Sequence, residues 1–249
     1  MSNWYCYDWE LGGQPAQFHV DLSYMEAFDT LGDFSTLLYV SCFSLVPDAV
    51  AFTARERRHL DGVLRDCLKV LDSKAVYVGF IDVLAQRRYF FYTSDARLLV
   101  PLMSVCEETE RFKVESVKAS EPNRQTYYRL LIPDRAKKQG VDNVLYIEAL
   151  RARGDDLSAK RRVNLHFYFP TTQGRALFER DAKLMGFSIG TSDYIPEQEL
   201  PYYLVLHAIR PLEKTEITLL TTKAIYTAEA YGGILEHFDS AFIPKRGWL

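Results

Sequence analysis

The sequence lacks several motifs that mark common enzyme classes. It has no phosphate-cradling Gly-x-x-x-x-Gly-Lys, no dinucleotide-binding Gly-x-Gly-x-x-Gly and no zinc-binding His-Glu-x-x-His. Cys106 is a poor nucleophile, because carboxylates such as Glu107 and Glu108 beside it raise a thiol's pKa. We therefore expect no serine-nucleophile motif of the type Gly-x-Ser-x-Gly, no catalytic residues and no cofactor.

An excess of basic charge is also missing. The formal net charge is -3, and neither residues 1–150 nor residues 151–249 are basic. Nucleic-acid-binding proteins usually present a Lys- and Arg-rich face that displaces counterions from phosphates. Direct binding of nucleic acid is therefore not expected.

Paired cysteines and long apolar runs are absent as well. The four cysteines, which include no Cys-x-x-Cys, are Cys6, Cys42, Cys67 and Cys106. This usage indicates reduced, mostly buried thiols in a cytoplasmic protein. The longest uncharged apolar run, Phe34 to Pro47, is too short and too polar to span a bilayer, and the N-terminus has no signal-like pattern. We expect no membrane association.

The first half of the chain predicts a sheet with two helices. An aromatic strand at residues 4–9 and an extended segment at 16–22 flank a Gly-Gly turn, which indicates a hairpin. A capping box formed by Thr53 and Glu56 predicts a helix start. Further strands are expected at 34–45, 75–83, 88–93 and 112–118, with a second helix at about 96–107. Residues 134–153 predict a linker helix, and the polar break after it places the domain boundary at 153/154.

The second half is organised around the strand Arg161 to Pro170. Its apolar residues fall on one face with a period of two, whereas Asn164, His166 and Tyr168 fall on the other. The order that follows is strand, helix, strand, strand, helix, strand. This is the ferredoxin-like pattern, in which the first and third strands lie in the centre and the fourth lies beside the first.

A family resemblance begins at the same place. Gly154-Asp155-Asp156-Leu157, the strand Val163 to Pro170, the pair Gly186-Phe187 and the pair Gly232-Gly233 resemble the regulator of ribonuclease E activity, type B. The resemblance covers about residues 154–243. Where the family tends to have Tyr-Asp-Gly-Trp-Glu, this chain has Leu235 to Asp239. Residues 1–150 resemble an uncharacterised bacterial domain often fused in front of it.

The resemblance implies a ferredoxin-like second domain in a cytoplasmic protein that binds and inhibits an endoribonuclease without chemistry of its own. The candidates for contact with a partner are Asp155, Asp156, Tyr168, Glu236, Phe238 and Asp239. For Asp155 and Asp156 an alternative stays open, in which both are solvated linker residues near a helix end.

Three histidines suggest a rival function. His166, His207 and His237 lie on three predicted neighbouring strands, and on a shared face they would form a ligand cluster for a metal or small molecule in an enzyme. In the alternative they are separate, half-exposed residues or pack against the N-terminal domain, and no metal site is assigned. We expect an α+β protein of two tandem α/β sandwich domains, 1–153 and 154–249. It would be a protein-binding regulator, monomeric or weakly homo-oligomeric.

Overall fold

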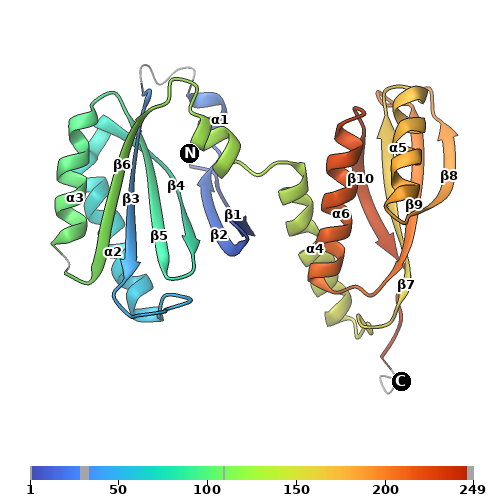
Figure 1. The fold of residues 1–249 in the computed structure, drawn as a ribbon, viewed down its shortest axis with the longest axis horizontal. Coiled ribbons are helices and arrows are strands. Elements are labelled where there is room, and N and C mark those ends of the chain that lie inside the picture. The colour runs from blue at the N-terminus through green and yellow to red at the C-terminus, as the bar shows by residue number, and fades with distance from the viewer. Residues whose placement is uncertain (1, 29–33, 109, 246–249) are drawn as a thin grey trace. The chain divides into compact units, whose positions relative to one another are not determined.

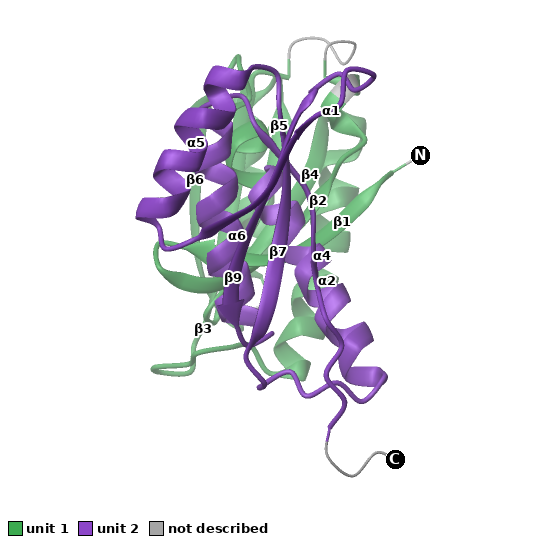
Figure 2. Cartoon of the chain, turned by 90° about the vertical axis from the view of Figure 1, so that its right-hand side faces the viewer, with its two compact units in different colours: residues 1–133 green, residues 134–249 purple. Residues whose placement is uncertain are grey.

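The computed structural model describes residues 2–28, 34–108 and 110–245. The chain divides into two compact units, Met1–Pro133 and Asp134–Leu249, drawn in green and purple in Figure 2. Each unit contains one antiparallel sheet together with helices. The expected α+β class is therefore confirmed.

Unit 1 contains a six-stranded sheet whose strands lie in the order β1-β2-β4-β5-β3-β6. The strands are β1 Trp4–Leu11, β2 Gln14–Asp21, β3 Thr36–Ser44, β4 Ala75–Val83, β5 Gln86–Thr93 and β6 Phe112–Ser120. The helices are α1 Tyr24–Ala27, α2 Ala54–Leu71 and α3 Leu99–Glu107, with short turns at Asp72–Lys74, Ala96–Leu98 and Thr126–Leu131. From β3 to β6 the strand order is that of a ferredoxin-like sheet, and the hairpin β1-β2 extends it beyond β4.

The two helices α2 and α3 pack on one face of this sheet (Figure 1). Alternate residues of β3, such as Leu38 and Val40, meet Leu60 and Val63 of α2 in a buried apolar cluster. Helix α2 begins at the predicted capping box, in which the Thr53 hydroxyl accepts from the Glu56 backbone and the Glu56 carboxylate accepts from Thr53. The local signals thus specified both the helix start and its buried face.

The opposite face of the unit 1 sheet is covered by the turn Thr126–Leu131. Tyr127 is fully buried and donates a hydrogen bond of 2.6 Å to the Asp21 carbonyl, and Tyr7 donates one of 2.8 Å to the Leu131 carbonyl. Phe28 packs edge-on against Tyr127. These contacts anchor the end of unit 1 to its own sheet.

Unit 2 contains a four-stranded sheet in the order β10-β7-β9-β8. Its elements are α4 Arg135–Ala152, β7 Arg161–Phe169, α5 Thr172–Leu184, β8 Ser188–Tyr194, β9 Tyr202–Arg210, α6 Lys214–Glu229 and β10 Ile234–Ser240. The first and third strands, β7 and β9, lie in the centre and the fourth strand, β10, lies beside the first. The ferredoxin-like topology predicted from the element order is confirmed.

One face of this sheet forms the core of unit 2. Val163, Leu165 and Phe167 of β7 are fully buried and belong to one apolar cluster with residues of α4, α5 and α6. The turn into β10 packs closely on this core and requires glycine, because a Cβ on Gly233 would lie 2.1 Å from the Phe169 ring. The period of two in β7 therefore sets which residues face the helices and which face away.

Helix α4 belongs to unit 2, so the compact units divide before it and not after it at 153/154. Ile147 and Leu150 lie in the core of unit 2, and the buried Asn143 donates to Thr221 of α6 over 2.9 Å. The buried stripe of α4 includes Gly140 and Asn143, so an apolar pattern does not reveal it. None of the helices within the described ranges is long and apolar enough to cross a membrane.

Candidate functional site

The candidate site is the sheet face of unit 2 that points away from its three helices, here called the open face. It carries Arg162, Asn164, His166 and Tyr168 from β7, Tyr203, Val205, His207 and Ile209 from β9, and His237 and Asp239 from β10. Apart from Val205, which is buried, these residues alternate with the buried positions of β7 and β9. The open face is polar and aromatic at its centre.

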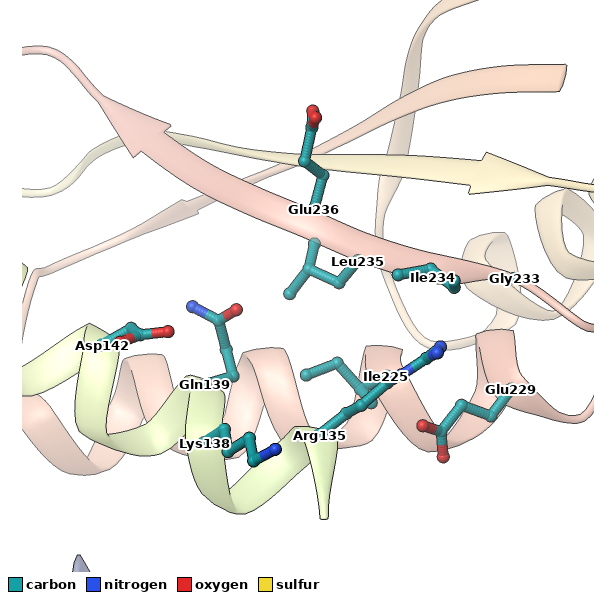
Figure 3. Close-up of a pocket in the computed structure, with 10 residues that line it drawn as sticks. All are labelled: Arg135, Lys138, Gln139, Asp142, Ile225, Glu229, Gly233, Ile234, Leu235 and Glu236. Carbon is teal, nitrogen blue, oxygen red and sulfur yellow. The ribbon is translucent and has the colours of Figure 1, made fainter. Parts of the chain in front are cut away.

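A β-bulge adds a carboxylate to this face. The register between β10 and β7 shifts between Leu235 and His237, which leaves Glu236 without an opposite residue. Glu236 is exposed and points away from the helices in Figure 3, and its carboxylate lies 3.2 Å from His237 Nδ1. The bulge thus places Glu236 and His237 together.

His166 sits in the middle of a hydrogen-bonded chain. Its Nε2 lies 2.6 Å from Asp239 Oδ2, and its Nδ1 lies 2.5 Å from the Tyr203 hydroxyl. In the neutral ring, Nε2–H donates to the ionised carboxylate, which only accepts, and the Tyr203 hydroxyl donates to Nδ1. Asn164 donates from Nδ2 to the other oxygen of Asp239 over 2.8 Å. The carboxylate and the imidazole are therefore both held in orientation.

The electrostatics of the face disfavour a nucleophile. Burial raises the pKa of Tyr203, and Tyr168, Glu236 and Asp239 raise it further. The pKa of Tyr168 is likewise raised, first by burial and then by Glu236. Both hydroxyls therefore keep their protons at neutral pH. They act as hydrogen-bond donors and as aromatic contact surface.

The structure brings together two of the three histidines. The rings of His166 and His237 stack with centroids 4.2 Å apart and an angle of 12° between their planes. His207 lies elsewhere, opposite Asn164, with Nδ1 3.1 Å from the Arg162 guanidinium. The pKa of His207 is lowered by burial and by Arg162. The three-histidine cluster of the rival hypothesis does not form, because the sheet register offsets His207 along β9.

Asp239 takes the place that His207 was expected to fill. Donor atoms of His166, His237 and Asp239 all lie within 4.8 Å of one another. The sequence contained a signal for this arrangement, since Asp239 follows His237 by two residues in a strand and so shares its face. Asn164 and Tyr203, which support the group, were not predicted and follow from the same period of two.

The structure corrects the prediction for Asp155. Its side chain is fully buried, and one carboxylate oxygen accepts from Arg161 over 2.7 Å and from the Ile243 backbone over 2.9 Å. Gly154 before it adopts a φ of +84° at the end of α4. Asp155 is thus neither a solvated linker residue nor a contact for a partner. Asp156 remains partly exposed and accepts from Ser158.

Phe238 is the second correction. It is 7% exposed and packs edge-on against Tyr146 of α4, with ring centroids 4.8 Å apart. Its position between His237 and Asp239 in a strand puts it on the core side. Of the six residues predicted to contact a partner, those that reach the surface are Asp156, Tyr168, Glu236 and Asp239.

Residues Gly186 to Gly190 match Gly-x-Ser-x-Gly, so the expectation that the chain has no motif of this type is wrong. In a nucleophile elbow the serine sits on a turn from a strand into a helix. Here the order is reversed, because α5 ends before Gly186 and Ser188 begins β8. Ser188 lies opposite His207, whose ring contacts Arg162 and not a carboxylate. The arrangement is not that of a catalytic triad.

The thiols of unit 1 are in environments that suppress reactivity. Cys42, Cys67 and Cys106 are buried, and the pKa of Cys106 is raised, first by its hydrogen bond to Cys42. Cys6 is exposed and lies 3.4 Å from His19 Nε2, a pair that was not predicted. Burial and the carboxylates of Asp8 and Asp82 raise the pKa of Cys6. Each of these shifts favours the unreactive thiol form.

A pocket of about 240 Å³ lies between α4, α6 and β10 (Figure 3). Its lining combines cationic Arg135 and Lys138 with anionic Asp142 and Glu229, beside the apolar Ile225 and Leu235. The mixed charges give no single sign to attract a ligand. The pocket lies on the helix side of β10 and shares Glu236 with the open face, to which the Glu236 side chain points.

Among the comparisons with known proteins, a family model matches the second half of the chain. The model of the family "Regulator of ribonuclease activity B" matches residues 142–240. No curated protein matches the chain. A crystal structure of an unknown protein from Galdieria sulphuraria is 9% identical, with a TM-score of 0.23 over 83% of this chain and 98% of that one. That likeness is too low to carry an argument.

Proposed function

Since residues 142–240 carry a domain of the family regulator of ribonuclease activity B, we propose that this protein is a non-enzymatic cytoplasmic regulator. It binds an RNA-degrading endoribonuclease through the open face of unit 2 and lowers the activity of that enzyme. The observation that carries the proposal is the family match together with an open face rich in aromatic and acidic groups.

The residues on the open face suit a protein contact. Tyr168 and Tyr203 are half-buried with ring centroids 5.0 Å apart, and tyrosines of this kind are common hot spots in interfaces. The Tyr168 hydroxyl stays protonated and can donate a hydrogen bond to a partner, whereas the Tyr203 hydroxyl already donates to His166. Because the aromatic pair lies on a regular sheet, it is held rigidly and loses little entropy on binding.

The charges on the face indicate the chemistry of the partner surface. Glu236 is exposed and Asp239 is half-exposed, and the charges of both act on Tyr203, whereas Tyr168 feels Glu236. Such carboxylates steer a basic surface toward the face and set the orientation of the complex. We infer that the contact surface of the ribonuclease is basic, with arginine or lysine side chains that reach Glu236.

The test is a titration of the purified protein against the cognate endoribonuclease, read both as binding and as the rate of RNA cleavage. Tyr168→Ala is expected to weaken binding by about 10-fold or more, as loss of an aromatic hot spot does. Glu236→Lys is expected to slow association and to make it less sensitive to salt. Glu216→Lys, the same charge change at an exposed position of α6, is the matched control.

Two results would contradict the proposal. In the first, the wild-type protein neither binds nor inhibits the ribonuclease at micromolar concentration. In the second, Glu216→Lys weakens binding as much as Glu236→Lys, which would move the contact away from the open face. If the protein binds but the rate of RNA cleavage does not change, the proposed interface stands and the proposed inhibition is wrong.

A further inference from the structure

We propose that His166, His237 and Asp239 form a binding site for a divalent transition metal, with Zn²⁺ as the favoured ion. Their donor atoms lie within 4.8 Å of one another. Two imidazoles and one carboxylate make a ligand set that zinc uses in proteins, with the fourth position left for water. The inference does not rest on the proposed function, because metal binding is a property of the chain alone.

The sheet holds the three donors in register. His166 on β7 lies directly opposite His237 on β10, and Asp239 follows on the same face of β10. Residues opposite each other on antiparallel strands have neighbouring side chains, and residues two apart in a strand point the same way. The three side chains therefore converge from two adjacent strands of one rigid sheet.

Partner groups already orient two of the ligands. His166 Nδ1 contacts the Tyr203 hydroxyl at 2.5 Å, and Asp239 Oδ1 accepts from Asn164 at 2.8 Å. Histidine ligands of metals are usually held in this way through the second ring nitrogen, and carboxylate ligands through the second oxygen. The atoms left to face each other are His166 Nε2 and Asp239 Oδ2, which are 2.6 Å apart.

Metal binding changes the tautomer of His166. An ion bound to Nε2 takes the position of the proton that Nε2 shares with Asp239. In the neutral ring that proton then resides on Nδ1, which donates to the Tyr203 hydroxyl oxygen. The hydroxyl reverses from donor to acceptor at Nδ1, so the hydrogen-bonded pair is kept.

Metal binding requires a small adjustment of the side chains. Ligand atoms at about 2.0–2.1 Å from a tetrahedral zinc ion lie roughly 3.3 Å apart, so His166 Nε2 and Asp239 Oδ2, which are 2.6 Å apart, have to separate and His237 has to turn toward them. The His237 ring stacks on the His166 ring, and its side chain is 52% exposed. Because it is exposed, it can rotate toward His166 Nε2 without a change in the backbone. Glu236 lies beside it and keeps the local potential negative, which favours a cation.

The experiment is a calorimetric titration of the metal-free full-length protein with Zn²⁺, repeated with Co²⁺ to record its visible absorption. One ion per chain is expected. Asn164→Ala removes a group that only orients a ligand and should reduce the Zn²⁺ affinity by about 10–100-fold. His237→Ala removes a ligand itself and should reduce the affinity by more than that. Circular dichroism checks that each variant is folded.

Two control variants decide where the metal binds. His207→Ala removes a histidine from the same face that is not in the group, and Cys6→Ala removes the exposed thiol beside His19. Both are expected to bind Zn²⁺ as the wild type does. The proposal is overturned if the wild type shows no saturable binding at micromolar Zn²⁺, if His237→Ala binds normally, or if either control loses the ion.

Discussion

At the scale of single residues, Asp155 shows how a motif in the sequence acquires a structural role. Its carboxylate and the Arg161 guanidinium form an ion pair in which both side chains are buried. Arg161 also donates to the Ala241 carbonyl over 3.0 Å, and Asp155 accepts from Ile243. The pair thus joins the end of α4, the start of β7 and the segment after β10.

The first prediction concerns this ion pair. Asp155→Ala is expected to lower the free energy of unfolding of unit 2 by about 3–5 kcal/mol, because it leaves Arg161 buried without its countercharge. Asp156→Ala, the partly exposed neighbour, should cost less than about 1 kcal/mol and serves as the control. Urea unfolding followed by circular dichroism measures both. Equal losses in the two variants would refute the structural role of Asp155.

At the scale of elements, the start of α2 is specified by contacts around Glu56. Its carboxylate accepts hydrogen bonds from the Ser44 hydroxyl at 2.6 Å and from the Thr53 backbone at 2.8 Å. The bonds from Ser44, first, and then from Thr53 lower the pKa of Glu56. The helix is therefore tied to β3 by hydrogen bonds that are stronger when the Glu56 carboxylate is charged.

The second prediction follows from the sign of that shift. Because the folded state lowers the pKa of Glu56, its contribution to stability is complete above the unfolded pKa, about 4.3, and is lost as the pH falls through the folded value. Glu56→Gln should destabilise unit 1 at pH 7 and have a smaller effect at pH 3. Denaturant unfolding at the two pH values measures this difference.

A second variant measures the contribution of the helix cap. Thr53→Ala removes the hydroxyl that caps the helix and is expected to cost about 1 kcal/mol at pH 7. Lys69→Ala, at an exposed position in the last turn of the same helix, should cost less than that. An effect of Glu56→Gln that is the same at both pH values would show that the carboxylate charge is not involved.

At the scale of the whole molecule, the chain consists of two units that share one topology. From β3 to β6 in unit 1 and from β7 to β10 in unit 2, the element order and the strand order are the same. The units differ in what is added to this pattern. Unit 1 gains the hairpin β1-β2, and unit 2 gains α4, which packs on α6 and completes the core.

The third prediction tests where unit 2 begins. A fragment of residues 134–249 is expected to unfold in a single cooperative transition. A fragment of residues 154–249 should lack that transition, because it loses Ile147 and Leu150 from the core and leaves Thr221 without Asn143. Thermal unfolding followed by circular dichroism compares them. Cooperative unfolding of the shorter fragment at the same temperature would place the boundary after α4.

The sequence by itself determined most of the elements and the buried faces of β7 and α2. The period of two predicted the buried face of β7, and the capping box predicted the start of α2. The order of strands and helices predicted the ferredoxin-like topology of unit 2. The motifs around Asp155 and Gly232 predicted the family whose model matches residues 142–240. These signals are local, because each depends on residues within a few positions of one another. Strand alternation also predicts that Phe238, between His237 and Asp239, faces the core.

Only the tertiary structure decided which residues meet. Asp239 joined His166 while His207 did not, because the register between strands and the bulge at Glu236 determine neighbours that spacing along the chain leaves open. Asp155 became buried because segments distant in sequence close over it. Helix α4 joined unit 2 because a stripe with small and polar residues fits against α6, and such a fit depends on the shape of the partner helix.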